Sequence, residues 1–408
     1  MLQQATPKFP ELPPLDGPRI GVLTRGHEAF QDELQAFVRA EVAPIAADFE
    51  GRSEYPLALL KRMGELGYLG IMFSKEYGGR GLDGLCYAMA VEEFSRWWGS
   101  LGITVAAHSS LGSGPLYYYG REELKREYLP LLTRCEIIGA YGLTEPQAGS
   151  DSGATATRAR KVGKEWVLNG TKCFCTNASY ARTYTVTAVT GEENGKKQIS
   201  AFFLDREKMP GITISKKEDK MGLRASDTCT VVLQDVKVPE AHMLGEEGQG
   251  FKIFMQTLDG GRITIGSMAL GLGQGALDEA VLWVNQQEGG FKSILDDQLT
   301  LEALSVMRTE LQAGRLLLYD AAVRRDARLP YTEFSSMAKF FASEAAVRAC
   351  NAAIEVMGEA GLREGTRVVR AYRDIKLCTI GEGTTEVQKL VIAREMLRQQ
   401  TQLPGSKT

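Results

Sequence analysis

The chain has 408 residues, of which 44% are hydrophobic, and this is enough to build two or three domains with buried cores. Its formal net charge of −3 gives no indication of nucleic-acid or membrane-surface binding, and no apolar run approaches the roughly 18 residues of a membrane span. The seven cysteines are odd in number and scattered, which is typical of reduced thiols rather than of a disulfide framework and favours a cytoplasmic protein.

The N-terminal part is predicted to be helical after a short arm. Residues 1–26 are rich in proline and lack the basic start and apolar middle of a signal peptide, so we expect an extended arm. Beyond it, Phe30, Leu34 and Phe37 recur at spacings of three and four, which indicates one buried face of a helix. Similar patterns follow, so residues 27–135 are predicted to form a helical domain.

Between residues 136 and 245 the pattern changes to that of a β domain. Runs such as TYTVTAVT, ISAFFLD and TCTVVLQDVKVP are short and rich in β-branched and aromatic residues. Glycine, asparagine, lysine and proline separate them at near-regular intervals, which is typical of an all-β sandwich or barrel rather than of βαβ units. We therefore predict a middle β-barrel domain over residues 136–245.

Residues 246–408 return to the helical period and are predicted to form a bundle. The segment at about 247–287 is expected to be one long helix if its glycines are tolerated, since each costs about 1 kcal/mol relative to alanine. Further helical patterns span about 298–328, 332–357 and 384–400. The fold class is thus α+β, with an N-terminal all-α domain, a middle β-barrel domain and a C-terminal four-helix bundle. Long amphipathic helices often pair across subunits, so we expect an oligomer.

Three polar stretches are candidates for a binding site. YGLTEPQAGSD, residues 141–151, joins the helical and β domains, and domain junctions favour ligands. TNA, residues 176–178, ends a strand. In RDIKLCTIGEGTTEVQ, residues 373–388, Glu382 lies between two glycines just before a helix start, where free N–H groups can bind an anion. The commoner explanations are a β-turn, a turn that ends a strand, and a capping or helix-dipole role, respectively.

Other kinds of site find no support in the sequence. His27, His108 and His242 lie far apart and no metal-ligand spacing occurs, so no metal site is predicted. The chain has no GxSxG, no phosphate-binding P-loop and no GxGxxG after a strand. GLGQG, residues 271–275, lies inside a helical pattern and argues against a Rossmann-type nucleotide site.

The combination of motifs resembles the acyl-CoA dehydrogenase family of flavoenzymes. GLTEPQAGSD, NGTKCFCTNA and RDIKLCTIGEGTTEVQKLVIAREML occur in this order around the β-rich middle, and the resemblance extends from about residue 28 to 400. It implies FAD between the middle domain and the C-terminal bundle, and an acyl-CoA as substrate. It also implies an electron-transfer flavoprotein as acceptor and a homotetramer built as a dimer of dimers, with no nucleic-acid or membrane partner.

The resemblance further implies roles for individual residues. The residues implied to contact FAD are Tyr141, Leu143 and Thr144 beside the isoalloxazine ring, Gly149 and Ser150 near the phosphates, Phe174 in place of the usual tryptophan, Thr176 around flavin N5, and Thr384 at the pyrophosphate. The residues implied to contact the substrate are Ser150, Arg262 and Gly383.

The implied reaction needs a base, because the α-proton of a thioester is weakly acidic. A carboxylate must take this proton as a hydride leaves the β-carbon for flavin N5, and it works best when burial raises its pKa toward the operating pH. In the family, a ribityl hydroxyl and the backbone N–H of the base stabilise the developing enolate. Glu382 matches the commonest position of the base. Some members carry the base before an arginine on the long helix instead. Here Gly261 precedes Arg262, so Glu382 is the only candidate for the base at these two positions.

Three positions depart from the family pattern, all at the implied site of the ADP half of FAD. Gln287 replaces an arginine, with Phe291 shifted, while Glu355 and Glu359 replace a glutamine and a glycine. Each change lowers the positive charge or adds negative charge near a diphosphate, at a cost of about 1–4 kcal/mol per like-charge pair. This corresponds to about one to three decades of affinity. Either other groups hold the ADP in a shifted pose, or FAD binds weakly, or a different subunit supplies half of the site.

The expected substrate is a short- to medium-chain or branched acyl-CoA. The small residues Ala106 and Ala107 leave space for a deep pocket unless neighbouring side chains fill it. Two alternatives share the fold. The first is a catalytically impaired or partner subunit of a heteromeric acyl-CoA dehydrogenase with weak FAD binding. The second is an acyl-CoA oxidase that uses oxygen.

Overall fold

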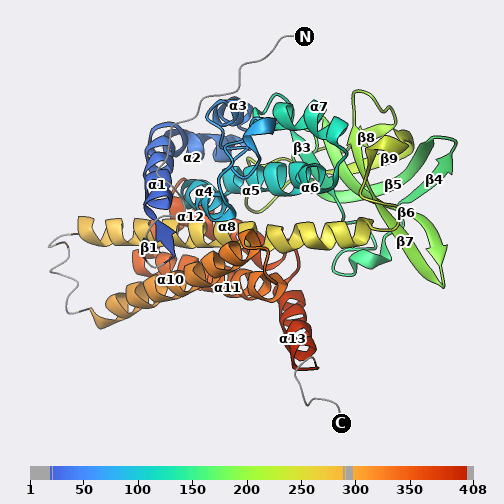
Figure 1. The fold of residues 1–408 in the computed structure, drawn as a ribbon. Helices are drawn as coiled ribbons and strands as arrows, with labels where there is room; N and C mark the ends of the chain where they lie inside the picture. The colour runs from blue at the N-terminus through green and yellow to red at the C-terminus, as the bar shows by residue number, and fades with distance from the viewer. Residues whose placement is uncertain (1–18, 21, 288–289, 291–296, 402–408) are drawn as a thin grey trace.

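The computed structural model describes residues 19–20, 22–287, 290 and 297–401. Along the chain, a helical part is followed by a sheet and then by a second helical part with longer helices (Figure 1). The predicted α+β fold class is therefore confirmed. Most of the predicted N-terminal arm lies outside the described residues. Among the helices that are described, none combines the length and the apolar character needed to cross a bilayer.

Local signals in the sequence explain how the first helix begins and which face it buries. The hydroxyl of Thr24 accepts a hydrogen bond from the His27 N–H, and the His27 ring in turn accepts one from the Thr24 N–H, which closes a capping box. Phe30, Leu34 and Phe37 are all buried, as their spacing predicts. The elements of this part are β1 (Arg19–Ile20), β2 (Leu23–Thr24), α1 (Arg25–Phe37), α2 (Ala43–Arg52), α3 (Leu57–Glu65), α4 (Gly84–Trp97), α5 (Gly99–Ala106), α6 (Gly114–Tyr119) and α7 (Glu122–Thr133).

The middle part is an eight-stranded sheet in the order β10-β7-β6-β4-β5-β9-β8, with β3 parallel to β6. This order does not close on itself, so the word barrel describes the sheet only loosely. The β6–β7 hairpin turns at Asn194 and Gly195, which both have positive φ, as a tight hairpin turn requires. The strands are β3 (Gly139–Gly142), β4 (Arg158–Val162), β5 (Glu165–Thr176), β6 (Thr183–Glu193), β7 (Lys196–Asp205), β8 (Ile212–Ile214), β9 (Thr228–Pro239) and β10 (Met243–Leu244).

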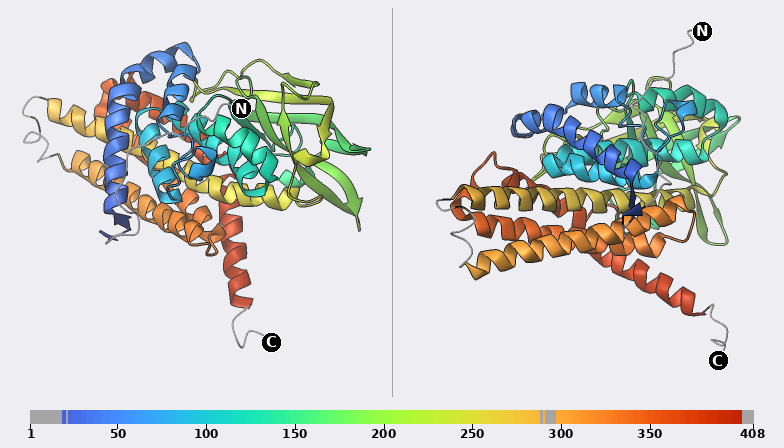
Figure 2. Two further views of the ribbon diagram at one scale, coloured as in Figure 1. Left: turned by 45° about the horizontal axis from the view of Figure 1, so that its top comes forward. Right: turned by 60° about the vertical axis from the view of Figure 1, so that its left-hand side comes forward.

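The last part is built on α8 (Gly250–Gln286), a helix of 37 residues that runs between the N-terminal helices and the rest of the bundle (Figures 1 and 2). Its glycines allow close packing: a Cβ at Gly271 or Gly275 would overlap with the backbone carbonyl of Glu92 or Arg96 on α4. The long helix predicted from the sequence is therefore confirmed. The other helices are α10 (Gln298–Asp326), α11 (Thr332–Met357), α12 (Arg367–Asp374) and α13 (Thr385–Thr401).

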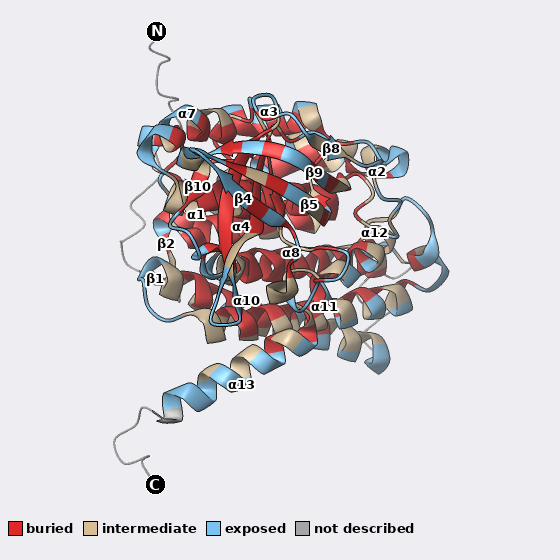
Figure 3. Ribbon diagram, turned by 90° about the vertical axis from the view of Figure 1, so that its right-hand side faces the viewer, coloured by how far each residue is buried: buried red, intermediate tan, exposed pale blue. Residues whose placement is uncertain are grey.

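Burial is uneven across the molecule. Residues 261–277 of α8 are all buried, whereas α13 projects away from the bundle and is largely exposed (Figure 3). Leu390, Met396 and Leu397 on α13 are each about half exposed. The described chain thus leaves an apolar helix face outside its own core.

Candidate active site

The predicted base lies on a tight turn between two helical segments. The short 3-10 helix η7 (Ile375–Thr379) ends before Glu382, and α13 begins at Thr385. Glu382 has φ +56° and Gly383 has φ +96°, so the turn uses the left-handed region at a residue that is not glycine. The Thr384 hydroxyl accepts a hydrogen bond from the Val387 N–H and so caps α13. The predicted position of Thr384 at a helix start is confirmed; its contact with the pyrophosphate stays a prediction.

The carboxylate of Glu382 points at α8. A Cβ added at Gly261 would overlap with Glu382 Oε2, so the absent side chain at residue 261 leaves the space that this oxygen occupies. Oε2 is enclosed and has no hydrogen-bond partner among the described residues. A buried carboxylate oxygen without a donor is rare in folded proteins and is a candidate for chemistry.

The pKa of Glu382 suits a general base that works near neutral pH. Burial raises its pKa to about 7, and the positive charges of Lys339 and Arg262 act in the opposite direction. Arg262 itself is buried and donates to Asp259 Oδ1 at 2.5 Å and to Ser336 Oγ at 3.2 Å. The structure therefore brings Arg262 and Glu382 together, with part of the arginine charge balanced by Asp259.

Tyr141 and Leu143 flank the start of the loop that follows β3. The Tyr141 ring is stacked on Phe254 of α8, with centroids 4.4 Å apart. Burial raises the pKa of its phenol, and the negative charge of Glu382 acts in the same direction. Leu143 and Thr144 are half-buried, and the Thr144 carbonyl accepts a hydrogen bond of 2.7 Å from the Cys173 N–H on β5. This part of the predicted ring site thus lies beside both β5 and α8.

The other residues predicted to contact FAD in this part of the chain are exposed or half-buried: Gly149, Ser150, Phe174 and Thr176. Gly149 and Ser150 are exposed in the loop, and nothing lies within 4 Å of a Cβ added at Gly149. Phe174 sits in a bulge of β5 with φ +55° and is 70% exposed, although it is a large apolar side chain. Thr176 is half-buried at the end of β5. An open loop and an uncovered aromatic ring leave room for a planar cofactor.

A buried ion pair that the sequence did not reveal holds the loop in place. Lys172 Nζ donates to Glu145 Oε1 at 2.7 Å and to the Leu143 carbonyl at 3.3 Å. The Glu145 carboxylate also accepts hydrogen bonds from the backbone N–H groups of Ala156 and Thr157. Both ends of the loop are therefore tied to one charged pair, which contacts the Leu143 carbonyl directly.

Lys339 is a second residue that sequence reasoning missed. It extends from α11 and its Nζ donates to the Gly383 carbonyl at 2.6 Å, next to the base. A signal was present, because this lysine stands on a helical face otherwise made of small buried residues, with Ser335, Ala338, Ala342 and Ser343 around it. A single cation on such a face indicates a buried partner.

The residues that depart from the family pattern at the implied ADP site have hydrogen-bond or ion-pair partners close to them in the sequence. Gln287 Nε2 donates to the Trp283 carbonyl at 2.9 Å, and Glu355 accepts a hydrogen bond from Asn351. Glu359 forms an ion pair of 3.3 Å with Arg363, with both side chains exposed. Phe291 lies outside the described residues. The negative charge at Glu359 is thus partly compensated by an arginine one helical turn away.

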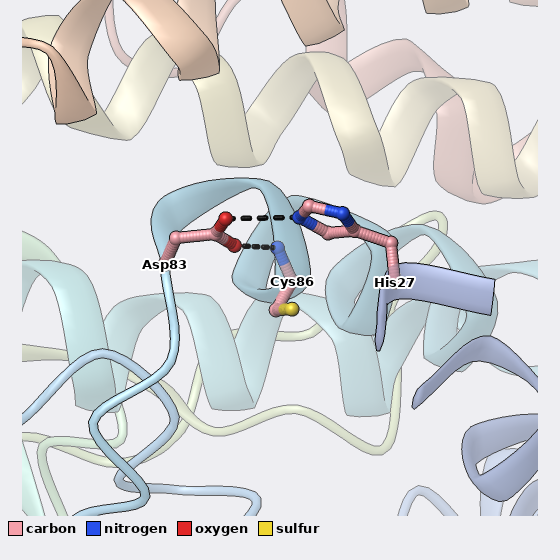
Figure 4. A group of neighbouring side chains, drawn as sticks. All are labelled: His27, Asp83 and Cys86. Carbon is pink, nitrogen blue, oxygen red and sulfur yellow. Dashed lines mark hydrogen bonds and ion pairs between the residues drawn. The ribbon is translucent and has the colours of Figure 1, made fainter. Parts of the chain in front are cut away.

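Two other polar clusters lie away from Glu382. In the first, His27 Nδ1 accepts from the Thr24 N–H, so Nε2 carries the proton and donates to Asp83 Oδ2 at 2.9 Å (Figure 4). Asp83 also caps α4 through the Cys86 N–H, so this group joins two helix starts and both nitrogens of the His27 ring have protein partners. The second is a groove of about 480 Å³ between α4, α8 and α10, in which Glu92 pairs with Arg315.

Comparison with known proteins identifies the family. Models of the N-terminal, middle and C-terminal domains of acyl-CoA dehydrogenase match residues 24–136, 140–236 and 248–397, respectively. The chain belongs to the acyl-CoA dehydrogenase family. It is thereby placed among flavin-dependent oxidoreductases that act on CH–CH bonds.

Relatives of this acyl-CoA dehydrogenase family member match over nearly their whole length. A probable acyl-CoA dehydrogenase of Bacillus subtilis is 45% identical over 92% of this chain and 99% of its own. A short-chain specific acyl-CoA dehydrogenase of Clostridium acetobutylicum is 42% identical with the same coverage. The solved structure of butyryl-CoA dehydrogenase from Megasphaera elsdenii has a TM-score of 0.87, at 38% identity over 91% of this chain and 98% of its own.

Proposed function

We propose that this chain catalyses the FAD-dependent α,β-dehydrogenation of an acyl-CoA thioester to the trans-2-enoyl-CoA, with Glu382 as the base. The observation that carries the proposal is the Glu382 carboxylate. Its Oε2 is enclosed without a hydrogen-bond donor among the described residues and points at Gly261, the long-helix position at which some family members carry their base.

Glu382 is a stronger base than an exposed glutamate, and a large fraction of it is ionised at neutral pH. Because burial raises its pKa to about 7, the carboxylate attracts an α-proton more strongly than an exposed glutamate, yet about half of it is ionised at pH 7. The enclosure keeps water from Oε2, so a bound thioester meets an unsolvated acceptor. The backbone N–H of Glu382 is the proposed donor to the thioester carbonyl, where it stabilises the developing enolate.

The residues proposed to hold FAD fit a planar aromatic group. Leu143 and Thr144 form a half-buried edge beside β5, next to the buried Tyr141, and the uncovered ring of Phe174 offers an apolar surface that a bound group would shield from water. Gly149, Ser150 and Thr384 are proposed for the phosphates. When bound, FAD supplies the acceptor for the hydride from the β-carbon.

For the substrate we propose a short-chain acyl-CoA, with Ser150, Arg262 and Gly383 in contact with it. The support is that a relative 42% identical is named short-chain specific and that a structure 38% identical is a butyryl-CoA dehydrogenase. A homotetramer is supported by the exposed apolar face of α13. An electron-transfer flavoprotein as acceptor, the cytoplasm as location and domain limits near residues 136 and 246 complete the proposal on the strength of the family alone.

A panel of acyl-CoA thioesters of two to eight carbons tests the proposal by anaerobic bleaching of the flavin in single turnovers. Glu382→Gln should retain FAD and slow the bleaching by about 10²–10⁴-fold, the usual contribution of a general base. Glu382→Asp is the matched control, because it keeps the charge and withdraws it by one methylene. A Glu382→Gln variant that bleaches at the wild-type rate would overturn the assignment of the base.

One alternative keeps a specific observation in its favour. Glu355 and Glu359 place two carboxylates where the family has neutral residues, which favours a partner subunit that binds FAD weakly. A colourless purified protein that never takes up FAD would support this alternative. A yellow protein that consumes oxygen with an acyl-CoA, in the absence of another acceptor, would instead support an acyl-CoA oxidase.

A further inference from the structure

The turn that carries Glu382 needs support from outside itself. Two successive residues, Glu382 and Gly383, have positive φ, and such a conformation persists at a non-glycine residue only where the surroundings fix it. Two side chains hold its carbonyls. Gln388 Nε2 donates to the carbonyls of Glu382 and Gly383 at 3.1 and 3.0 Å, and Lys339 Nζ donates to that of Gly383 at 2.6 Å.

A lysine at position 339 is not needed merely to hold the turn, because a neutral donor could form the same hydrogen bond. Its side chain is fully buried, and among the described residues it forms no ion pair within 4.0 Å. A buried cation without a paired carboxylate is costly, and the neutral donor Gln388 already donates to the same Gly383 carbonyl. The charge of Lys339 therefore calls for an explanation that the hydrogen bond alone does not provide.

The acid on the turn that Lys339 contacts is Glu382, whose Oε2 has no hydrogen-bond partner among the described residues. We infer that Lys339 is a positioning residue for the proposed reaction: it fixes the turn that carries Glu382 and supplies the positive charge that keeps this carboxylate available as a base. The inference rests on the proposed function in that Glu382 is taken as the base.

The signs of the interactions agree with this role. Lys339 and Arg262 both lower the pKa of Glu382, but Arg262 forms an ion pair with Asp259, whereas Lys339 forms no ion pair within 4.0 Å in the described part of the chain. Burial lowers the pKa of Lys339 to about 8 and the charge of Arg262 acts in the same direction, while the negative charges of Glu382 and Glu344 act to raise it. Between about pH 7 and 8, then, the ammonium of Lys339 and the carboxylate of Glu382 are both charged. The remaining groups that face this pair are Tyr87 from α4, Tyr141 from β3 and Cys378 from η7, and burial raises the pKa of each, so they stay neutral in this range.

The test is an infrared titration of the Glu382 carboxylic acid band, assigned by its loss in Glu382→Gln. In Lys339→Met the midpoint should rise by about one pH unit or more, since an opposite charge nearby has been removed. Such a rise lowers the ionised fraction at pH 7 from about one half to about one tenth, so flavin reduction there should slow about five-fold and recover at higher pH.

Gln388→Met is the matched control, because it removes the other donor to the same carbonyls without changing any charge. Its Glu382 midpoint should stay at the wild-type value, even if the rate falls equally at every pH. A Lys339→Met midpoint equal to that of the wild type, or a Gln388→Met midpoint shifted as far, would overturn the inference.

If Lys339→Met does not fold, the reciprocal measurement decides. Glu382→Gln keeps the size of the side chain and removes its charge, so the midpoint of Lys339, followed by NMR of ¹³Cε-labelled lysine, should fall. An unchanged Lys339 midpoint would refute the link. Both titrations report the coupling whether or not Glu382 proves to be the catalytic base, which the rate of Glu382→Gln decides separately.

Discussion

The buried pair of Lys172 and Glu145 gives a demanding test of how the loop before β4 is held. Lys172→Met removes the ammonium and keeps an unbranched apolar chain, so Glu145 retains its backbone hydrogen bonds from Ala156 and Thr157 but loses its counter-charge. Breaking one side of a buried pair costs about 3–5 kcal/mol. In Lys172→Met/Glu145→Gln no buried charge is left uncompensated, so this double variant should recover a large part of that loss.

The pH dependence of the same pair has a definite sign. Burial alone would raise the pKa of Glu145, but Lys172 and the hydrogen bonds of Thr155 and Thr157 outweigh it and lower the pKa to about 2 from the usual 4.5. Because the folded value is the lower one, the pair stabilises the protein above pH 4.5. This contribution is lost progressively as the pH falls from about 4.5 to about 2.

Thermal unfolding of the apoprotein and of the FAD-loaded protein at pH 7, followed by circular dichroism, measures the effect. The single variant should unfold well below the wild type and bind FAD more weakly, because the loop with Leu143 and Thr144 loses its anchor. The double variant should fall between them. A single variant within 1 kcal/mol of the wild type, or a double variant less stable than the single, would refute this account of the loop.

Three further predictions concern the base and the cofactor. Gly261→Ala should reduce flavin reduction by at least about ten-fold without loss of helix stability, because the new methyl group displaces Glu382 Oε2; wild-type kinetics would contradict this contact. The single-turnover rate should rise with pH through about 7 and then level off, since Glu382 must be ionised to accept a proton, and a rate that falls over this range would exclude it as the base. Glu355→Gln should tighten FAD binding up to about ten-fold in a fluorescence titration, with Asn351→Ala as a control that leaves the charge in place.

Patterns of burial were predictable from the sequence, whereas contacts between distant segments were not. The helix from Gly250 to Gln286 could be predicted because its apolar period survives its glycines, and β9 could be predicted from its β-branched run. The pair of Lys172 and Glu145 spans 27 residues, and no local pattern connects its members. The strand β3 and the helix α12 are too short, at 4 and 8 residues, for a period to single them out in the sequence.

The base could be proposed only through family resemblance, because an acidic residue at this position, just before a helix, more often has a capping or helix-dipole role. What the structure adds is the reason why Gly261 and Glu382 belong together: one leaves the space that the other fills. The roles of the individual FAD and substrate residues, and the limits of the three domains, remain predictions for the experiments above.

The length of α8 has a consequence for how this sequence can vary. Over about 55 Å the helix carries Phe254 under Tyr141, Gly261 against Glu382 and Gly271 against α4, all on one rigid rod. Inserting or deleting a single residue between these contacts would turn every later side chain by about 100° and shift it by about 1.5 Å. Substitutions can be absorbed one at a time along this rod, but changes of length cannot, so evolution and protein engineering alike should find insertions only beyond its ends.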